Sequence, residues 1–153
     1  MTHPSIEYLY QPNQDVLRFG NRILINAYGM RSPDFPALKQ DPDERRILVF
    51  GDSVLNGGAQ TDHEALATSI LSRQLADVWH KPLVVGNVSA GSWGPGNWLA
   101  YAREYGLFDA DAVVLVMSSH DTADNPTFAP LNPNTHPTEC PWTAVGEGLT
   151  RYY

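Results

Sequence analysis

Three polar segments of the chain contain residue types suited to acyl-transfer chemistry. Gly51, Asp52 and Ser53 directly follow an apolar run, and the segments 87–95 and 118–121 each follow another. A serine hydroxyl becomes a nucleophile when a base removes its proton. Fixed N–H groups then stabilise the oxyanion that forms on the attacked carbonyl. Ser53 is therefore the candidate nucleophile of an ester-cleaving or acyl-transferring site.

The apolar runs before these segments predict the strands of a parallel sheet. They are Ile47–Phe50, Leu83–Val85 and Ala112–Met117. Unbroken apolar runs of this length are typical of parallel strands that are buried on both faces. Ligands and catalytic groups of open α/β sheets collect at the carboxyl ends of the strands.

Helical patterns separate the predicted strands. Apolar residues repeat at helical spacing over 66–78, behind a capping residue at 61 or 62, and a shorter helix is expected over 95–105. Strands that alternate with helices form right-handed βαβ units. The three polar segments are therefore expected to meet at one edge of the sheet.

The regions on either side of this core have different patterns. Residues 1–46 are interpreted as an amino-terminal arm and linker, with a hairpin whose turn is predicted at Gly20-Asn21. Residues 47–125 form the predicted α/β core. The proline-rich residues 126–153 are interpreted as a loop or tail, because periodicity disappears after Asp121.

Composition narrows the classes of function. A formal charge of −7 argues against nucleic acid as a partner. Cys140 is the only cysteine, which excludes an internal disulfide and a multi-cysteine zinc site, and no metal is expected. No apolar run approaches the roughly 18 residues of a membrane span, and no signal peptide is visible. A soluble protein, cytoplasmic by default, is expected.

The three segments together resemble the GDSL or SGNH hydrolases. Gly51-Asp52-Ser53 is similar to the first block of that family, 87–95 to the glycine-containing second block, and 111–121 to the third. The lead-in 26–31 resembles that of bacterial members associated with polysaccharide and lipid modification. The resemblance implies a flavodoxin-like three-layer α/β/α fold and no cofactor. It also implies a serine esterase, deacetylase or O-acyltransferase that acts on acyl esters of carbohydrate or lipid.

The resemblance also implies roles for individual residues. Ser53 would be the nucleophile, and its own N–H and that of Gly91 would form the oxyanion hole, although Ser92 fits the spacing equally well. His120 stands where the family has an asparagine donor. An imidazole can donate a hydrogen bond, so His120 is either a third oxyanion donor or a cap of the strand end.

Other residues near these segments have two interpretations each. Asp52 could tune the nucleophile loop or bond nearby backbone N–H groups, and Asp121 could orient a partner. Trp93 could contact substrate, but such an aromatic residue more often packs in the core.

A catalytic base is the missing part of the pattern. The family's Asp-x-x-His block is expected near the carboxyl terminus, but only Asp77 and His80 have that spacing, at the end of a predicted helix. His136 could fold over the site, and His63 is interpreted as a solvated first-turn residue.

Three visible strands and no base lead us to expect an amino-terminal portion of a longer protein. Its sheet would expose an apolar edge, which a swapped homo-oligomer or a partner chain could cover. The alternative function is a non-catalytic carbohydrate- or ester-binding domain. A nucleotide-binding flavodoxin-like domain is disfavoured, because no phosphate loop is present.

Overall fold

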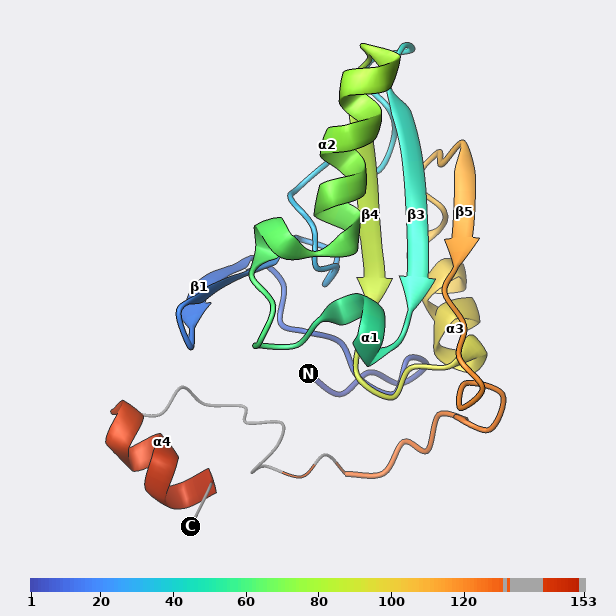
Figure 1. Cartoon of the computed structure of the whole chain (residues 1–153). Coiled ribbons are helices and arrows are strands. Elements are labelled where there is room, and N and C mark those ends of the chain that lie inside the picture. Colours follow the sequence, from blue (N-terminus) through green and yellow to red (C-terminus); the bar gives the residue numbers. More distant parts are fainter. Residues whose placement is uncertain (131, 133–141, 152–153) are drawn as a thin grey trace.

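A three-stranded parallel sheet forms the centre of the computed structural model, which describes residues 1–130, 132 and 142–151. The strands are β3 (Arg45–Gly51), β4 (Leu83–Ser89) and β5 (Ala112–Leu115), in the order β4-β3-β5 (Figure 1). The α/β class and the parallel arrangement predicted from the sequence are confirmed.

Two strand ends differ from the prediction. β4 continues to Ser89, four residues beyond the apolar run. The added residues pair with β3: Asn87 lies opposite Val49, and Ser89 lies opposite Gly51. β5 is shorter than expected and ends at Leu115. The last residue pair between β3 and β5 is Phe50 with Leu115.

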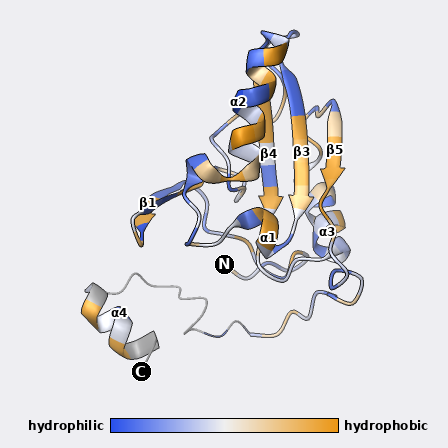
Figure 2. Ribbon diagram, viewed as in Figure 1, coloured by the Kyte–Doolittle hydropathy of each residue, from blue (hydrophilic) through white to orange (hydrophobic). Residues whose placement is uncertain are grey.

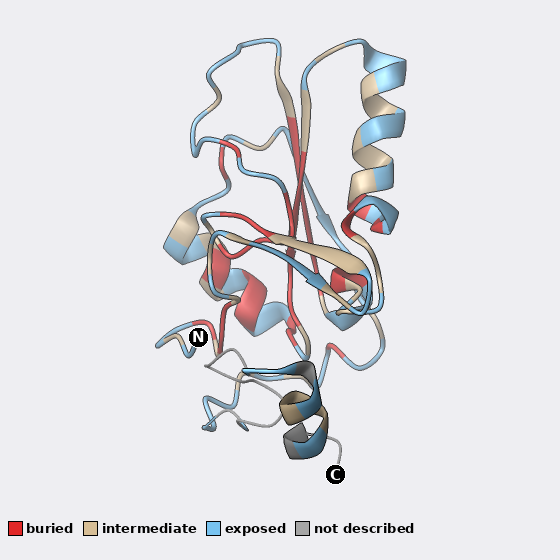
Figure 3. Cartoon of the chain, turned by 90° about the vertical axis from the view of Figure 1, so that its left-hand side faces the viewer, coloured by how far each residue is buried: buried red, intermediate tan, exposed pale blue. Residues whose placement is uncertain are grey.

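Helices pack on both faces of the sheet. Alternate residues of β3 point to opposite faces, so the strand contributes to two apolar clusters. Helix α2 (Ala67–Trp79) packs against one cluster, and α3 (Pro95–Tyr105) contributes to the other (Figure 1). The α2 cluster contains Ile47, Val49, Leu71, Leu75 and Val85, and the α3 cluster contains Leu48, Phe50, Val88, Trp98 and Tyr101. Figure 3 shows the buried sheet interior beside the largely exposed α2.

The predicted first long helix is divided into two elements. Asp62 caps a 3-10 helix, η1 (His63–Ala65), by accepting a hydrogen bond from the Glu64 N–H. Leu66 then has an extended conformation and is buried, and α2 begins after it. The continuous helix from residue 61 or 62 was therefore wrong, since burial of Leu66 interrupts the helical backbone.

The predicted hairpin is present, but its turn lies one residue earlier than expected. Strands β1 (Gln14–Arg18) and β2 (Asn21–Ile25) pair so that Arg18 faces Asn21. The two loop residues are therefore Phe19 and Gly20, with φ of 52° and 81°. Such positive angles are those of a two-residue hairpin turn.

The amino-terminal arm is part of the main core. Ile6, Tyr8 and Leu9 are buried in the same cluster as α3 and the sheet, and Met30 and Phe35 join them. The arm therefore contributes directly to the structure around the carboxyl edge of the sheet.

The carboxyl-terminal region contains a helix that the sequence did not predict. Helix α4 (Ala144–Arg151) replaces part of the expected loop, and its Glu147 forms an ion pair with Arg18 of β1. The Glu147 N–H donates to the Thr143 carbonyl in the first turn. His136 and Cys140 lie outside the described residues.

The edge of the sheet at β5 is apolar and exposed, as expected. Val113 to Met117 are all exposed, and Figure 2 shows the apolar colour of β5 along the outer edge. In the described part of the chain, no helix combines the length and hydrophobicity needed to cross a bilayer.

Candidate active site at the carboxyl edge of the sheet

Ser53 is exposed at the first position of the short helix α1 (Ser53–Asn56), immediately after β3. Asp52 caps this helix, because its Oδ1 accepts the Val54 N–H at 2.9 Å. Gly51 permits the tight turn, since a Cβ there would lie 2.8 Å from the Leu55 Cβ. The interpretation of Asp52 as a residue that bonds nearby backbone is consistent with this cap.

The second segment contacts the first through two side-chain hydrogen bonds. The Asn56 Nδ2 donates to the Ser89 carbonyl at 2.9 Å. The Trp98 Nε1, from α3, donates to the Gly51 carbonyl at 3.1 Å. These contacts fix the end of β4 and the start of α3 beside the turn that carries Ser53.

The third segment completes the arrangement. After β5, the Val116 N–H donates to the Phe50 carbonyl at 2.8 Å. Gly94 packs so closely against this segment that a Cβ there would lie 2.3 Å from the Asp124 carbonyl oxygen. Asp121 is buried and accepts the Ser118 N–H at 2.5 Å. The three polar segments therefore meet at one edge, as the parallel topology predicts.

An open cavity of about 460 Å³ lies at this edge. Its lining joins α1 and the loop that follows it to the second segment and the arm: Tyr10, Ser53, Val54, Asn56, Gly57, Gly58, Gln60 and Gly91. The Tyr10 hydroxyl donates to the Asn56 Oδ1 at 3.2 Å, which fixes the arm to this wall.

Three backbone N–H groups near this cavity are available as donors. Within the described residues, the N–H groups of Ser53, Gly91 and Ser92 form no hydrogen bond. The Ser92 backbone has a φ of 55°, in the left-handed region. Unpaired N–H groups beside an exposed hydroxyl are the arrangement that an oxyanion hole requires.

His120 lies in the third segment with an exposed side chain. Its backbone N–H donates to the Ser118 Oγ at 3.3 Å, which holds the turn after β5. Both interpretations of His120, oxyanion donor and strand-end residue, are compatible with this position.

Four carboxylates lie close enough to one another to interact, and one of them, Asp52, directly precedes Ser53. Burial raises the pKa of Asp124, and the nearby charges of Glu7, Asp121 and Asp52 raise it further. Through Asp52, this acidic group adjoins the turn that carries Ser53. Negative charge next to a site disfavours anionic ligands.

In the described residues, no side chain forms a hydrogen bond with the Ser53 hydroxyl. His80 is the C-cap of α2, at the opposite edge of the sheet, as predicted (Figure 1). His63 is only 3% exposed, so its interpretation as a solvated residue was wrong. Strand β2 and helix α2 contact η1, and the Arg22 N–H of β2 donates to the Asp62 side chain that caps η1.

Trp93 lies in the hydrophobic core and is 2% exposed. Its ring is 6.4 Å from that of Tyr8 and 6.0 Å from that of Tyr101, between centroids. Trp93 is therefore a core residue. Its ring packs against other aromatic side chains, and it does not line the cavity at Ser53.

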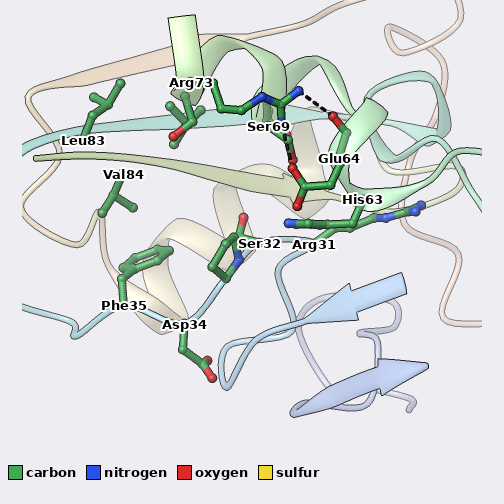
Figure 4. A pocket seen from close by; sticks show the side chains of 14 residues that line it. Arg31, Ser32, Asp34, Phe35, His63, Glu64, Ser69, Arg73, Leu83 and Val84 are labelled. Carbon is green, nitrogen blue, oxygen red and sulfur yellow. Dashed lines mark hydrogen bonds and ion pairs between the residues drawn. The ribbon is translucent and has the colours of Figure 1, made fainter. Parts of the chain in front are cut away.

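A second cavity, of about 240 Å³, lies between α2, β4 and residues 31–35 (Figure 4). Arg31 and His63 are two of its lining residues, and burial lowers the pKa of His63. The Arg31 guanidinium also donates to the carbonyls of Asn56, Gly58 and Thr61. Arg31 thus holds the loop that follows α1.

Sequence reasoning missed Tyr8, Tyr10 and Arg31 as residues of this site. Each of them lies more than twenty residues before Ser53 in the sequence, so no helical or strand periodicity links it to the site. A long-range hydrogen bond from an arm to a loop has no local signature.

Across residues 1–130, 132 and 142–151, no group of three or more His, Cys, Asp or Glu side chains is placed to hold a metal ion. No family model matches the chain, and no curated protein or solved structure gives a significant match.

Proposed function

We propose that this chain is a serine-dependent ester hydrolase or acyltransferase domain of the SGNH type, with a flavodoxin-like three-layer fold. The observation that carries the proposal is an exposed Ser53 at a strand end, beside unpaired N–H groups of residues 91 and 92 from the neighbouring strand. An exposed serine hydroxyl and fixed oxyanion donors are two of the three parts that acyl transfer through a serine requires, and a base that accepts the serine proton is the third.

The reaction proceeds in two steps. The Ser53 Oγ attacks the ester carbonyl, its proton passes to the departing alkoxide, and an acyl-serine forms. Water or an alcohol then attacks the acyl carbonyl, the bond from that carbonyl to the Ser53 Oγ breaks, and the proton of the attacking group passes to the departing Oγ. Free Ser53 is regenerated, and a carboxylic acid or a new ester is released. In both steps the oxyanion accepts hydrogen bonds from the Ser53 N–H and from the second segment, and His120 is the candidate third donor.

The substrate is an uncharged acyl ester of a carbohydrate or lipid. The acidic group that includes Asp52, next to Ser53, favours an uncharged ligand over a phosphate or carboxylate. The open cavity next to Ser53 accommodates the acyl group and part of the alcohol.

Hydrolysis of short-chain aryl esters and acetylated sugars tests this proposal. We expect wild-type activity to be abolished by Ser53→Ala and retained by the control Ser5→Ala, at an exposed serine of the arm. Equal activity of wild type and Ser53→Ala would exclude Ser53 as the nucleophile.

A second candidate is a non-catalytic carbohydrate- or ester-binding domain. It is favoured by the Ser53 hydroxyl, which has no basic partner among the described residues. This function predicts no turnover at any pH, together with calorimetric binding of an acetylated sugar that His120→Ala weakens. Turnover that depends on Ser53 excludes it.

A further inference from the structure

The loop after β4 offers two candidate oxyanion donors, and a hydrogen bond from the amino-terminal arm constrains the orientation of one of them. Gly91 and Ser92 are adjacent, and neither N–H has a partner among the described residues. The Ser92 N–H belongs to the peptide unit that also contains the Gly91 carbonyl. The direction of that carbonyl therefore determines where the Ser92 N–H points.

The Gly91 carbonyl is held by the amino-terminal arm. The Tyr8 hydroxyl donates a hydrogen bond to it at 2.6 Å, over a separation of 83 residues. In a trans peptide unit the C=O and N–H point in opposite directions, and the chain has no cis peptide bond. The Ser92 N–H therefore points away from the Tyr8 hydroxyl. Ser92 itself is exposed, and the adjoining Gly91 lines the cavity at Ser53.

Gly91 is adapted to this contact. A Cβ at Gly91 would lie 3.1 Å from the Tyr8 hydroxyl oxygen, closer than an ordinary contact. Any larger residue at position 91 would press against the hydroxyl. The close approach of the Tyr8 hydroxyl thus depends on the missing side chain.

Tyr8 is itself rigidly placed. Its ring packs edge-on against those of Tyr10 and Trp93, and the neighbouring Ile6 and Leu9 are buried in the core. Burial raises the pKa of the Tyr8 hydroxyl above its usual value. The group therefore remains a protonated donor at every pH at which an esterase would be assayed.

We infer that Tyr8 is a positioning residue for the oxyanion hole, and that the donor of the second segment is the Ser92 N–H. Its hydroxyl fixes the peptide unit between residues 91 and 92 so that this N–H is available beside Ser53. The catalytic part of the inference rests on the proposed function. The orientation of the peptide unit does not, and it can be measured separately.

The test compares Tyr8→Phe with Tyr101→Phe. Both substitutions remove a buried tyrosine hydroxyl that donates to a backbone carbonyl, Gly91 in one case and Tyr28 at 2.9 Å in the other. Tyr101→Phe therefore controls for the loss of stability. The amide NMR spectrum reports the Ser92 N–H directly, and steady-state hydrolysis of an aryl acetate gives kcat and KM.

Tyr8→Phe is expected to shift the Ser92 amide resonance and to lower kcat by roughly 10-fold to 100-fold with KM unchanged, since a misdirected donor loses part of its effect. Tyr101→Phe should change neither. An unmoved Ser92 resonance in Tyr8→Phe would overturn the inference. Equal kcat values for the two variants in an active enzyme would also overturn it, while the proposed function would stand.

If the wild type neither cleaves esters nor reacts at Ser53, the proposed function fails and the Ser92 resonance alone decides the role of Tyr8. Gly91→Ala provides a second variant in case Tyr8→Phe does not fold. Its added Cβ displaces the hydroxyl by a few tenths of an ångström. The Ser92 amide resonance should then shift in Gly91→Ala as it does in Tyr8→Phe. An unchanged chemical shift would contradict the inference.

Discussion

Arg31 connects the amino-terminal part of the chain to the loop after α1, and replacing it tests whether Arg31 holds that loop in place. Arg31→Lys keeps the positive charge but removes the planar fork of donors. In the wild type, the guanidinium donates to the carbonyls of Asn56, Gly58 and Thr61, the first at 2.7 Å in a buried position. A lysine ammonium in the same place can replace only part of this set.

The expected cost follows from the bonds that are lost. A hydrogen bond from a charged donor contributes about 1.5–3 kcal/mol, and partly exposed ones contribute less. With one of the three bonds retained, Arg31→Lys should lower the free energy of unfolding by about 2–3 kcal/mol. This is a large part of the stability of a small domain, so the midpoint of unfolding should move clearly.

Urea unfolding at 25 °C, followed by circular dichroism, measures this change. The matched control is Arg22→Lys, at an exposed arginine that pairs with Asp15 on the hairpin, and it should leave the midpoint unchanged. Amide hydrogen exchange at residues 56–61 should also become faster in Arg31→Lys alone. Equal unfolding midpoints for the two variants would refute the anchoring role.

Three further predictions concern the surroundings of the site. Because burial lowers the pKa of His63, the unfolded state binds its proton more readily. Stability should therefore decline as pH falls below 6.5, and His63→Leu should show less of this decline in thermal melts than His80→Leu. Because the pKa of Asp124 is raised, Asp124→Asn should stabilise the fold at pH 7, and the gain should vanish below pH 3.8, where both states are protonated. Gly94→Ala should destabilise by about 1–3 kcal/mol through overpacking against the third segment, whereas Gly148→Ala, with open space around it, should not in the same melts.

The strands could be predicted from the sequence because burial on both faces leaves a direct pattern. The apolar runs from Ile47 and Ala112 define β3 and β5 to within a few residues. β4 was predicted too short, since Asn87 and Ser89 are polar residues whose side chains form hydrogen bonds within the fold. The polar residues after Val85 indicated a loop, but their pairing with β3 makes them part of strand β4.

The remaining differences have tertiary causes. The turn at Phe19 depends on the register of β1 with β2, which places a phenylalanine at a positive φ. Helix α1 has four residues and was missed, because it is too short for a periodic signal. The burial of His63 depends on packing from a distant part of the chain. Helix α4 lies in a region where prolines obscured the pattern.

The candidate nucleophile could be proposed from the sequence, but its surroundings could not. Ser53 was identified by its place after an apolar run, and the parallel topology brought the second and third segments to it. Tyr8 and Arg31 act through hydrogen bonds to backbone carbonyls, and any tyrosine or arginine could do so. Residue type alone therefore gives no indication of their role.

Covalent labelling tests the central claim most directly. The chain is incubated with a fluorophosphonate, digested, and the modified peptide is located by mass spectrometry. The account predicts one adduct, on Ser53, that is absent from Ser53→Ala and present in Ser5→Ala. No adduct on the folded wild type, or an adduct that persists in Ser53→Ala, would contradict the claim that Ser53 is the nucleophile.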